Sequence, residues 1–417
     1  MDGSGSGIHP DQIHSIGSEN PVQRCMVCVN GPQRGMNMTD RPYPIRIAQI
    51  IGEAPNGGVE SVIRNYYQHI DRTKFQFDFY VNNTSDIIRK DKIEEMGGRI
   101  FIIPPYKKNL YVFEKYLYKK FKEEKYVIVH SNMNTISYFV LRAAKKAGVP
   151  IRIAHSHSTS NPNEKMRNMI KNVLKRKSCV YPTNYVACSE SAGRWLFGED
   201  NFTEKGVVIP NGIDIEKFKF SIEERNEVRK AYHIADSTTL IGHVGRLVKQ
   251  KNQQFLISVF ADYKKINPDS VLMILGEGPL KEILLKQIQE LNLENSVFFV
   301  GSHKHPERFY SAFDVFMLPS LYEGLGMVLI EAQISGLPCI MSSEIPMEAK
   351  ILDSCIRLPI DLKEKWVKAL IGLNQASSNI RNLAYECFLG KEFDIIADSH
   401  ILEDYYNNLI AYTENKQ

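Results

Sequence analysis

The sequence predicts an α/β protein with two doubly wound parallel sheets. From Ile45 onward, short apolar runs alternate with longer amphipathic stretches. The alternation stops at a Pro-Asn-Gly-Ile-Asp break (210–214) and then restarts. At 417 residues the chain is too long for one typical core, which favours two domains of about 150–200 residues. Apolar runs bounded by turn residues are typical of strands buried on both faces of a parallel sheet.

The apolar runs of each half are the expected strands of one sheet. In the first half they are Ile45–Ile51, Phe75–Val81, Arg99–Ile103, Tyr126–His130, Ile151–Ala154, Thr183–Cys188 and Gly206–Ile209. In the second half they are Leu240–Val244, Val271–Leu275, Val297–Val300, Val315–Leu318 and Pro338–Met341. Helices are expected between them, for example from Val59, over Thr135–Ala147 and over Ile222–Tyr232.

This pattern divides the chain into four segments. Residues 1–43 are rich in Gly, Ser, Pro and Asn and lack periodicity, so we expect a disordered leader or tail, with Met36 or Met38 as a natural start. Residues 44–210 and 211–393 are the expected Rossmann-like domains, facing each other across a cleft at the carboxyl ends of their strands. Residues 394–417 are expected to form one helix that crosses back to the N-terminal domain. Its expected apolar face is Ile395, Ile396, His400, Ile401, Leu402, Tyr405 and Leu409.

Composition excludes several classes of protein. A net charge of +4 is small for this length and does not indicate a nucleic-acid binder. No stretch approaches the ~20 apolar residues that a membrane span needs. The seven cysteines are scattered and odd in number, which favours a reduced, cytoplasmic setting. Cys25 and Cys28 form a single Cys-x-x-Cys, too little for a metal site.

The most informative segment follows the expected strand Val315–Leu318. A loop with Glu323, Gly324 and Gly326 leads into a helix-like run that carries Glu331 eight residues after the first glutamate. A strand, glycine loop and helix offer backbone N–H groups and a positive helix end to a phosphate. One carboxylate can then reach a sugar hydroxyl and the other a ribose. The alternative is an ordinary strand–helix unit with two solvated glutamates.

Two cations precede this module. Gly245 and Arg246 end the first strand of the second half, and Lys251 follows near the start of the next helix. An arginine at a strand end and a lysine in the next loop can clamp a diphosphate without a metal ion. The alternative is a pair of solvated surface cations. The Gly-Glu-Gly-Pro turn containing Glu277 permits close approach of a base or phosphate, or is simply a turn before a helix.

Together these motifs resemble the donor site of the retaining glycosyltransferases of family four, which have the GT-B fold. The 210–214 break is similar to the linker signature of that family, and the resemblance covers nearly everything from Ile45 onward. The stretch Arg152–Ser158 is similar to exopolysaccharide glycosyltransferases of the EpsF type.

The resemblance implies roles for the matching residues. Arg246 and Lys251 would bind the donor diphosphate, Glu331 the ribose hydroxyls and Glu323 the transferred sugar. The expected catalytic residues are His155, Arg246, Lys251 and Glu323. The remaining expected donor-binding residues are Gly57, Gly58, Asn211, Gly245, Glu277, Gly324, Leu325, Gly326 and Met327. The resemblance also implies a UDP-linked hexose as co-substrate, retention of configuration, and neither a cofactor nor a metal.

The first half carries two weaker signals. Gly57 and Gly58 open the first expected helix, where glycines let the backbone approach a substrate. His155 and His157 follow the strand Ile151–Ala154; no third ligand with suitable spacing is near, which argues against zinc. The resemblance places a histidine at this strand end, close to the transferred sugar, and His155 fits that position best. His157 is more simply structural.

Two basic amphipathic stretches, Lys107–Lys125 and Lys165–Lys177, bear on partners. Either their apolar faces pack on the sheet while the lysines point to water, or they contact an anionic membrane surface. The second reading suits a lipid-linked or glycan acceptor and a peripheral position at the inner face of the cell membrane.

Two alternatives to a transferase stay open. A nucleotide-sugar epimerase or hydrolase would use the same scaffold without an acceptor, and a nucleotide-sugar binding protein would not react at all. A dehydrogenase is disfavoured, because no Gly-x-Gly-x-x-Gly follows the first strand of either half.

Overall fold

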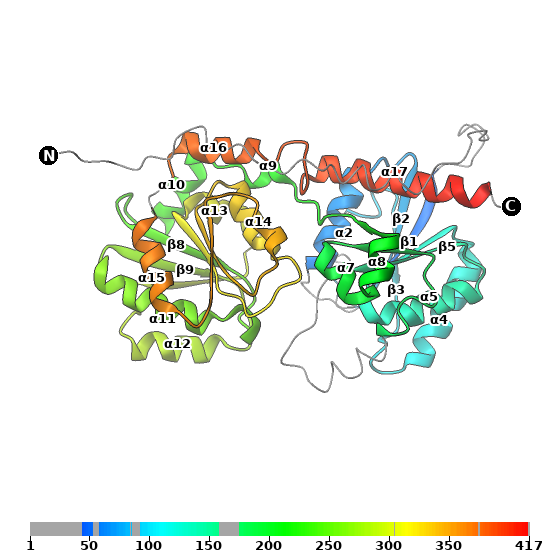
Figure 1. Cartoon of the computed structure of the whole chain (residues 1–417), viewed down its shortest axis with the longest axis horizontal. Helices are drawn as coiled ribbons and strands as arrows, with labels where there is room; N and C mark the ends of the chain where they lie inside the picture. Colours follow the sequence, from blue (N-terminus) through cyan, green and yellow to red (C-terminus); the bar gives the residue numbers. More distant parts are fainter. Residues whose placement is uncertain are drawn as a thin grey trace. The chain divides into compact units, whose positions relative to one another are not determined.

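The computed structural model describes residues 44–52, 58–83, 85, 92–157, 175–303, 305–373 and 376–415 (Figure 1). The expectations for the leader 1–43, for Cys25 and Cys28, for Gly57 and for residues 165–174 of the second basic stretch lie outside the described residues.

The first sheet has seven parallel strands in the order β3-β2-β1-β4-β5-β6-β7. Their bounds are β1 Ile45–Gly52, β2 Phe75–Val81, β3 Arg99–Ile102, β4 Ile128–Ser131, β5 Ile151–Ser156, β6 Asn184–Ala187 and β7 Gly206–Val208. Every residue of β2 is buried, as expected for a strand with helices on both faces. The order reverses between β1 and β4, which makes this pair the switch point of the sheet.

The second sheet has six parallel strands in the order β10-β9-β8-β11-β12-β13. Their bounds are β8 Thr239–Val244, β9 Ser270–Leu275, β10 Val297–Gly301, β11 Val315–Leu318, β12 Cys339–Ser342 and β13 Cys355–Leu358. Its switch point lies between β8 and β11. The edge strand β13 was not predicted, because its four residues include the exposed Arg357 and carry little apolar signal.

Helices cover both faces of each sheet (Figure 1). Those of the first half are α2 Gly58–His69, α4 Leu110–Glu124, α5 Ser137–Lys146, α7 Glu190–Phe197 and α8 Glu199–Lys205, with the 3-10 turn η3 Asn134–Ile136. Those of the second half are α9 Ile215–Phe218, α10 Ile222–Ala231, α11 Gln253–Ile266, α12 Lys281–Glu290, α13 Glu307–Ala312, α14 Met327–Ile334, α15 Lys363–Gly372 and α16 Ser378–Glu386, with η4 Lys249–Lys251 and η5 Met347–Ala349. The last helix is α17 Ile395–Glu414.

The last helix packs on the first sheet, although the second sheet precedes it in the chain. Its Tyr406 ring contacts Phe75 and Phe77 of β2 at 5.5 and 6.4 Å between centroids. The face predicted from the sequence was wrong at Ile396 and His400, which are exposed. The buried face instead includes Asp398, because the contacts of the helix with α2 and the strands decide its rotation.

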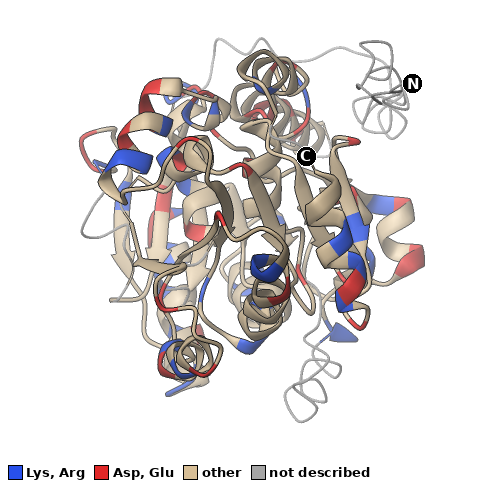
Figure 2. Ribbon diagram, turned by 90° about the vertical axis from the view of Figure 1, so that its left-hand side faces the viewer, with Lys and Arg blue, Asp and Glu red and all other residues tan. Residues whose placement is uncertain are grey.

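In α4 the apolar face packs into the core of the first half, with Phe113, Leu117 and Phe121 fully buried. Its lysines point to water, and Tyr111 and Val112 at its start are also exposed. Charges of both signs are interspersed over the described ribbon (Figure 2).

Candidate functional site

Several of the predicted donor residues lie at the switch point of the second sheet. Gly245 and Arg246 follow β8, and the loop with Glu323 follows β11, the strand paired with β8. Parallel strands end at one edge of a sheet, so these two loops are neighbours although about 80 residues separate them. Ligands bind doubly wound sheets at this position.

Glycines allow the loops after β8 and β9 to touch backbone to backbone. A Cβ on Gly276, whose φ is +138°, would lie 2.1 Å from the carbonyl oxygen of Gly245. A Cβ on Gly278 would lie 2.4 Å from the carbonyl oxygen of Leu247. The Leu247 amide donates to the Glu277 carbonyl at 3.0 Å. A side chain therefore does not fit at either glycine, and the two loops contact each other through backbone atoms beside the switch point.

Lys251 and Glu323 form a largely buried ion pair across the switch point. The Lys251 Nζ donates to Glu323 Oε1 at 2.7 Å, and the two side chains are 14% and 8% exposed. Gln250 links the same two loops. Its side-chain Nε2 donates to the Tyr322 carbonyl at 3.0 Å, and its backbone carbonyl accepts from the Leu321 amide at 2.8 Å. The predicted cation and carboxylate therefore lie together at this edge of the sheet.

Glu331 lies one helical turn inside α14, which begins after Gly326 in the left-handed conformation at φ 91°. Its Oε2 accepts a hydrogen bond of 2.6 Å from the Tyr310 hydroxyl. Burial raises the pKa of Glu331, and the Tyr310 hydrogen bond and the Lys251 charge oppose that rise. The carboxylate therefore shares an electrostatic environment with the Lys251–Glu323 pair. The N-terminus of α14 has no side-chain hydrogen-bond cap among the described residues.

The other two charged candidates differ from this cluster. Arg246 is exposed, and its guanidinium has no ion pair with any residue that the structure describes. Glu277 is exposed and pairs loosely with Lys281 at 3.7 Å on the α12 side of its loop. The structure brings Lys251, Glu323 and Glu331 together, places the exposed Arg246 on the loop after β8, and leaves Glu277 at the exposed side of its own loop.

At the first sheet, His155 is the last but one residue of β5 and lies inside a buried group of polar side chains. Its Nδ1 lies 3.0 Å from Nε2 of His130, and its ring stacks on His157 at 3.9 Å. Burial, with the neighbouring imidazoles, holds the pKa of His155 well below its usual range. Burial also lowers the pKa of His130 to about 3 and of His157 to about 4. All three rings are therefore neutral at pH 7.

Two predicted donor residues remain, Asn211 and Gly58. Asn211 was expected in the donor site, and the structure places its buried side chain beside His157. There it raises the pKa of His157, but by less than burial lowers it. Neither Asn211 Oδ1 nor His157 Nδ1 has a partner with hydrogen-bond geometry among the described residues. Gly58 is the exposed first residue of α2.

Sequence reasoning missed several of the partners that shape these sites. Tyr310 holds Glu331, while His130, Gln49 and Tyr406 connect to His155. His130 carried a usable signal, because it is a polar residue at the end of a predicted strand. Tyr406 gave no such signal, because a tyrosine on the apolar face of a helix is typical of the hydrophobic core.

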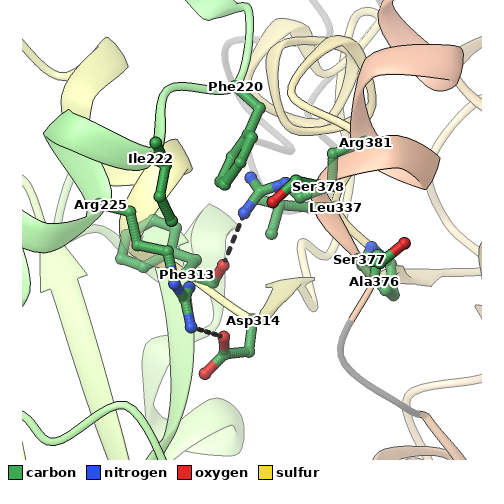
Figure 3. A pocket seen from close by; sticks show the side chains of 11 residues that line it. Phe220, Ile222, Arg225, Phe313, Asp314, Leu337, Ala376, Ser377, Ser378 and Arg381 are labelled. Carbon is green, nitrogen blue, oxygen red and sulfur yellow. Dashed lines mark hydrogen bonds and ion pairs between the residues drawn. The ribbon is translucent and has the colours of Figure 1, made fainter.

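A separate cavity of about 170 Å³ lies at the opposite end of the second sheet (Figure 3). Phe313 and Asp314 lead into β11 there, and Leu337 leads toward β12. Arg381 donates to four backbone carbonyls, those of Tyr310, Ser311, Phe313 and Ser335. Arg225 pairs with Asp314 at 2.9 Å. Both arginines therefore have structural partners, which are backbone carbonyls for Arg381 and a carboxylate for Arg225. The cavity that they line lies away from the switch point.

Two further properties concern metals and membranes. Within the described ranges, no three His, Cys, Asp or Glu side chains are grouped so that they could hold a metal ion. None of the described helices combines the length and apolar character that crossing a bilayer requires.

Comparison with known proteins gives a consistent result. A family model described as Glycosyltransferase Family 4 matches residues 56–217, and one described as Glycosyl transferases group 1 matches residues 224–354. The chain is 35% identical to the glycosyltransferase EpsF of Bacillus subtilis over 72% of this chain and 79% of the relative. It is 27% identical to the UDP-Gal:alpha-D-GlcNAc-diphosphoundecaprenol alpha-1,3-galactosyltransferase of Escherichia coli over 86% of this chain and 97% of the relative.

Solved structures share the fold at lower identity. HepE of Anabaena, in complex with UDP and glucose, superposes with a TM-score of 0.73 and 19% identity, covering 87% of this chain and 99% of that one. Sucrose-phosphate synthase of Thermosynechococcus elongatus gives a TM-score of 0.70 and 18% identity, covering 88% and 100%. The shared architecture is the pair of Rossmann-like domains with parallel sheets.

Proposed function

Because the chain belongs to glycosyltransferase family four, with its GT-B fold, and is a transferase of polysaccharide or glycolipid synthesis, we propose that it moves a hexose from a UDP-linked donor to a lipid-linked or glycan acceptor. The anomeric configuration of the donor is retained in the product. The observation that carries this proposal is the convergence of Lys251, Glu323 and Glu331 at the switch point between β8 and β11, beside Arg246, which has no ion pair among the described residues.

Each of these residues has a role in the proposed reaction. The exposed guanidinium of Arg246 and the ammonium of Lys251 bind the diphosphate and neutralise the charge that develops as the nucleotide leaves. Glu323 fixes the position of Lys251 at 2.7 Å and contacts the sugar. Glu331, held by Tyr310, accepts hydrogen bonds from the ribose hydroxyls. The amides of Gly324, Leu325, Gly326 and Met327 lie at the positive end of α14, where a phosphate is favoured.

The assignment of charge neutralisation to side chains makes a metal ion unnecessary in this scheme. The acceptor hydroxyl attacks the anomeric carbon on the face from which the nucleotide departs, so no enzyme nucleophile is assigned. His155 hydrogen-bonds a hydroxyl of the transferred sugar. The choice of UDP and of a lipid-linked acceptor draws on the Escherichia coli relative, whose name includes both a UDP-linked sugar and a diphosphoundecaprenol carrier.

A donor panel tests the first half of the proposal. Thermal unfolding is followed with UDP-glucose, UDP-galactose, UDP-N-acetylglucosamine and GDP-mannose, each with and without EDTA. We expect one UDP-sugar to raise the melting temperature, because a ligand that binds only the folded state stabilises it. Glu331→Gln should weaken that shift. Stabilisation by the GDP-sugar alone would contradict the choice of nucleotide.

A transfer assay tests the second half. The stabilising donor is incubated with N-acetylglucosamine on a short-chain polyprenyl diphosphate, and the product is analysed by mass spectrometry and NMR. We expect a disaccharide with the donor's anomeric configuration. An inverted linkage would refute retention. An epimer or free sugar without transfer would identify an epimerase or hydrolase, and donor binding without turnover on any acceptor would identify a binding protein.

The proposal includes an anionic membrane surface as a partner through α4. Tyr111 and Val112 are 72% and 44% exposed at its start, and the exposed Lys115, Lys119 and Lys122 follow. Basic side chains near an anionic bilayer contribute about 1 kcal/mol each. Sedimentation with phosphatidylglycerol vesicles should therefore retain the protein, and a variant with these three lysines changed to Gln should bind less. Equal binding to neutral phosphatidylcholine vesicles would refute this part.

A further inference from the structure

A continuous chain of buried hydrogen bonds links the last helix to His155. Gln49 of β1 donates from Nε2 to the Tyr406 hydroxyl oxygen at 3.0 Å. That hydroxyl lies 2.8 Å from Nδ1 of His130 on β4, and His130 Nε2 lies 3.0 Å from Nδ1 of His155 on β5. The four side chains are at most 2% exposed, so water does not interrupt the chain.

The direction of each bond follows from its donors. Asn132 Nδ2 donates to Gln49 Oε1 at 3.0 Å, which orients the Gln49 amide with Nε2 toward Tyr406. Since the Tyr406 oxygen accepts there, its proton goes to His130 Nδ1. A neutral imidazole carries one proton, so that of His130 lies on Nε2 and points at His155 Nδ1. The single proton of His155 is then on Nε2.

His155 Nε2 is where the chain ends. It is buried and has no hydrogen-bond partner among the described residues. A buried donor without a partner is unfavourable, and a ligand acceptor at this position would remove that cost. Burial keeps the pKa of His155 well below its usual range, so the ring presents one fixed N–H rather than a charge.

We propose that Tyr406 and His130 are positioning residues that hold the proton of His155 on Nε2, so that this N–H donates to a hydroxyl oxygen of the transferred sugar. The inference rests on the proposed function only through the contact of His155 with the sugar. It assigns the C-terminal helix, whose Tyr406 lies 357 residues from Gln49 in the chain, a part in the chemistry of the first sheet.

The neighbouring His157 ends a different branch with the opposite polarity. Its Nε2 lies 2.9 Å from Asn132 Oδ1 and donates to it, because the Asn132 amide group is already turned toward Gln49. Its Nδ1 is then a bare acceptor without a partner among the described residues. The same network thus presents a donor on His155 and an acceptor on His157. Turning both amides would reverse every bond, which makes the tautomer of His155 the decisive observable.

The first experiment reads the tautomer directly. Protein with ¹⁵N-labelled histidine is examined by long-range ¹H–¹⁵N correlation, and the His155 signals are assigned with His155→Gln. We expect protonated Nε2 in the wild type and a mixture of tautomers in Tyr406→Phe, which keeps the ring packing on Phe75 and Phe77. A bare Nε2 in the wild type, or an unchanged tautomer in Tyr406→Phe, would overturn the inference.

The second experiment measures turnover with the stabilising UDP-sugar. Tyr406→Phe should lower kcat by about 10-fold with little change in the KM for the donor, as expected for loss of an orienting hydrogen bond. The matched control is Tyr67→Phe, which loses a buried hydroxyl bond of 2.5 Å to Gln76 in the same domain and should keep its kcat. Equal losses in both variants would indicate a structural effect and overturn the inference.

The two proposals fail in distinguishable ways. Normal kcat in Tyr406→Phe together with loss of turnover in His155→Gln would refute the positioning role and leave the proposed function intact. Full turnover in His155→Gln would remove His155 from the site and refute the inference, while the transfer activity itself would stand; absence of turnover in the wild type with every UDP-sugar would instead refute the proposed function. If Tyr406→Phe does not fold, Gln49→Met removes the donor to the same hydroxyl at similar volume and is read by the same tautomer signal.

Discussion

Breaking the Lys251–Glu323 pair should destabilise the protein more than breaking an ordinary surface pair. Removing one partner of a buried ion pair typically costs about 3–5 kcal/mol, because the other charge stays buried. Here the Glu323 side chain is 8% exposed and keeps a 3.3 Å contact with Gln250, so we expect the lower end of that range, about 3 kcal/mol, for Lys251→Met. Glu323→Gln should cost about 1–2 kcal/mol, since the remaining Lys251 can turn toward water.

A double-mutant cycle tests this reasoning by urea denaturation. The double variant loses both charges, so its cost should be smaller than the sum of the single variants by about 2 kcal/mol. The exposed pair of Lys281 and Glu277, 3.7 Å apart and 41% and 52% exposed, is the matched control. Lys281→Met should change the free energy of unfolding by less than about 0.5 kcal/mol. Additive costs at Lys251 and Glu323 would refute a direct interaction across the switch point.

Three further predictions follow from individual residues. Arg246→Ala should leave the urea midpoint nearly unchanged, because the side chain is exposed and has no ion pair within the described ranges, but should lower kcat by roughly 100-fold if it neutralises the leaving diphosphate; a normal kcat would exclude that role. Gly276→Ala should lower the free energy of unfolding by about 2–4 kcal/mol, since its Cβ would lie 2.1 Å from the Gly245 carbonyl oxygen at an unfavourable φ. The control Gly372→Ala, where a Cβ would meet nothing within 4 Å, should be neutral or stabilising in the same urea denaturation. Burial, and then the Glu392 charge, raises the pKa of Asp398 well above its usual value. A carboxyl whose pKa is higher in the folded state stabilises the fold below its unfolded pKa and loses that contribution as pH rises through the folded pKa. Asp398→Asn should therefore flatten the decline of stability with rising pH, and an identical pH profile in both proteins would contradict this.

The fold class could be predicted because its signal is local. Fully buried parallel strands must be continuous apolar runs, and twelve of the expected runs overlap strands in the structure. The short β13 escaped because four residues with an exposed arginine resemble a loop. The rotation of α17 was predicted less well, since Ile396 is apolar but exposed while Asp398 is polar but buried.

The donor-site candidates were recognisable for a similar reason. Glu323 and Glu331 are eight residues apart on one loop and helix, so their spacing could be seen in the chain. The glycines at 276 and 278 were visible as a turn, but their purpose was not. Only the packing of the loops after β8 and β9 shows that a side chain at either position would meet a carbonyl oxygen.

Short-range order in this protein, meaning strands, helices and glycine turns, is written in the periodicity of neighbouring residues. The pairing of Lys251 with Glu323 across 72 residues, and the link from Gln49 through Tyr406 and His130 to His155, depend on which strands lie side by side and on where the last helix docks. Such contacts leave no local pattern in the sequence, because polar groups at strand ends become neighbours only once the strands are assembled into the sheet.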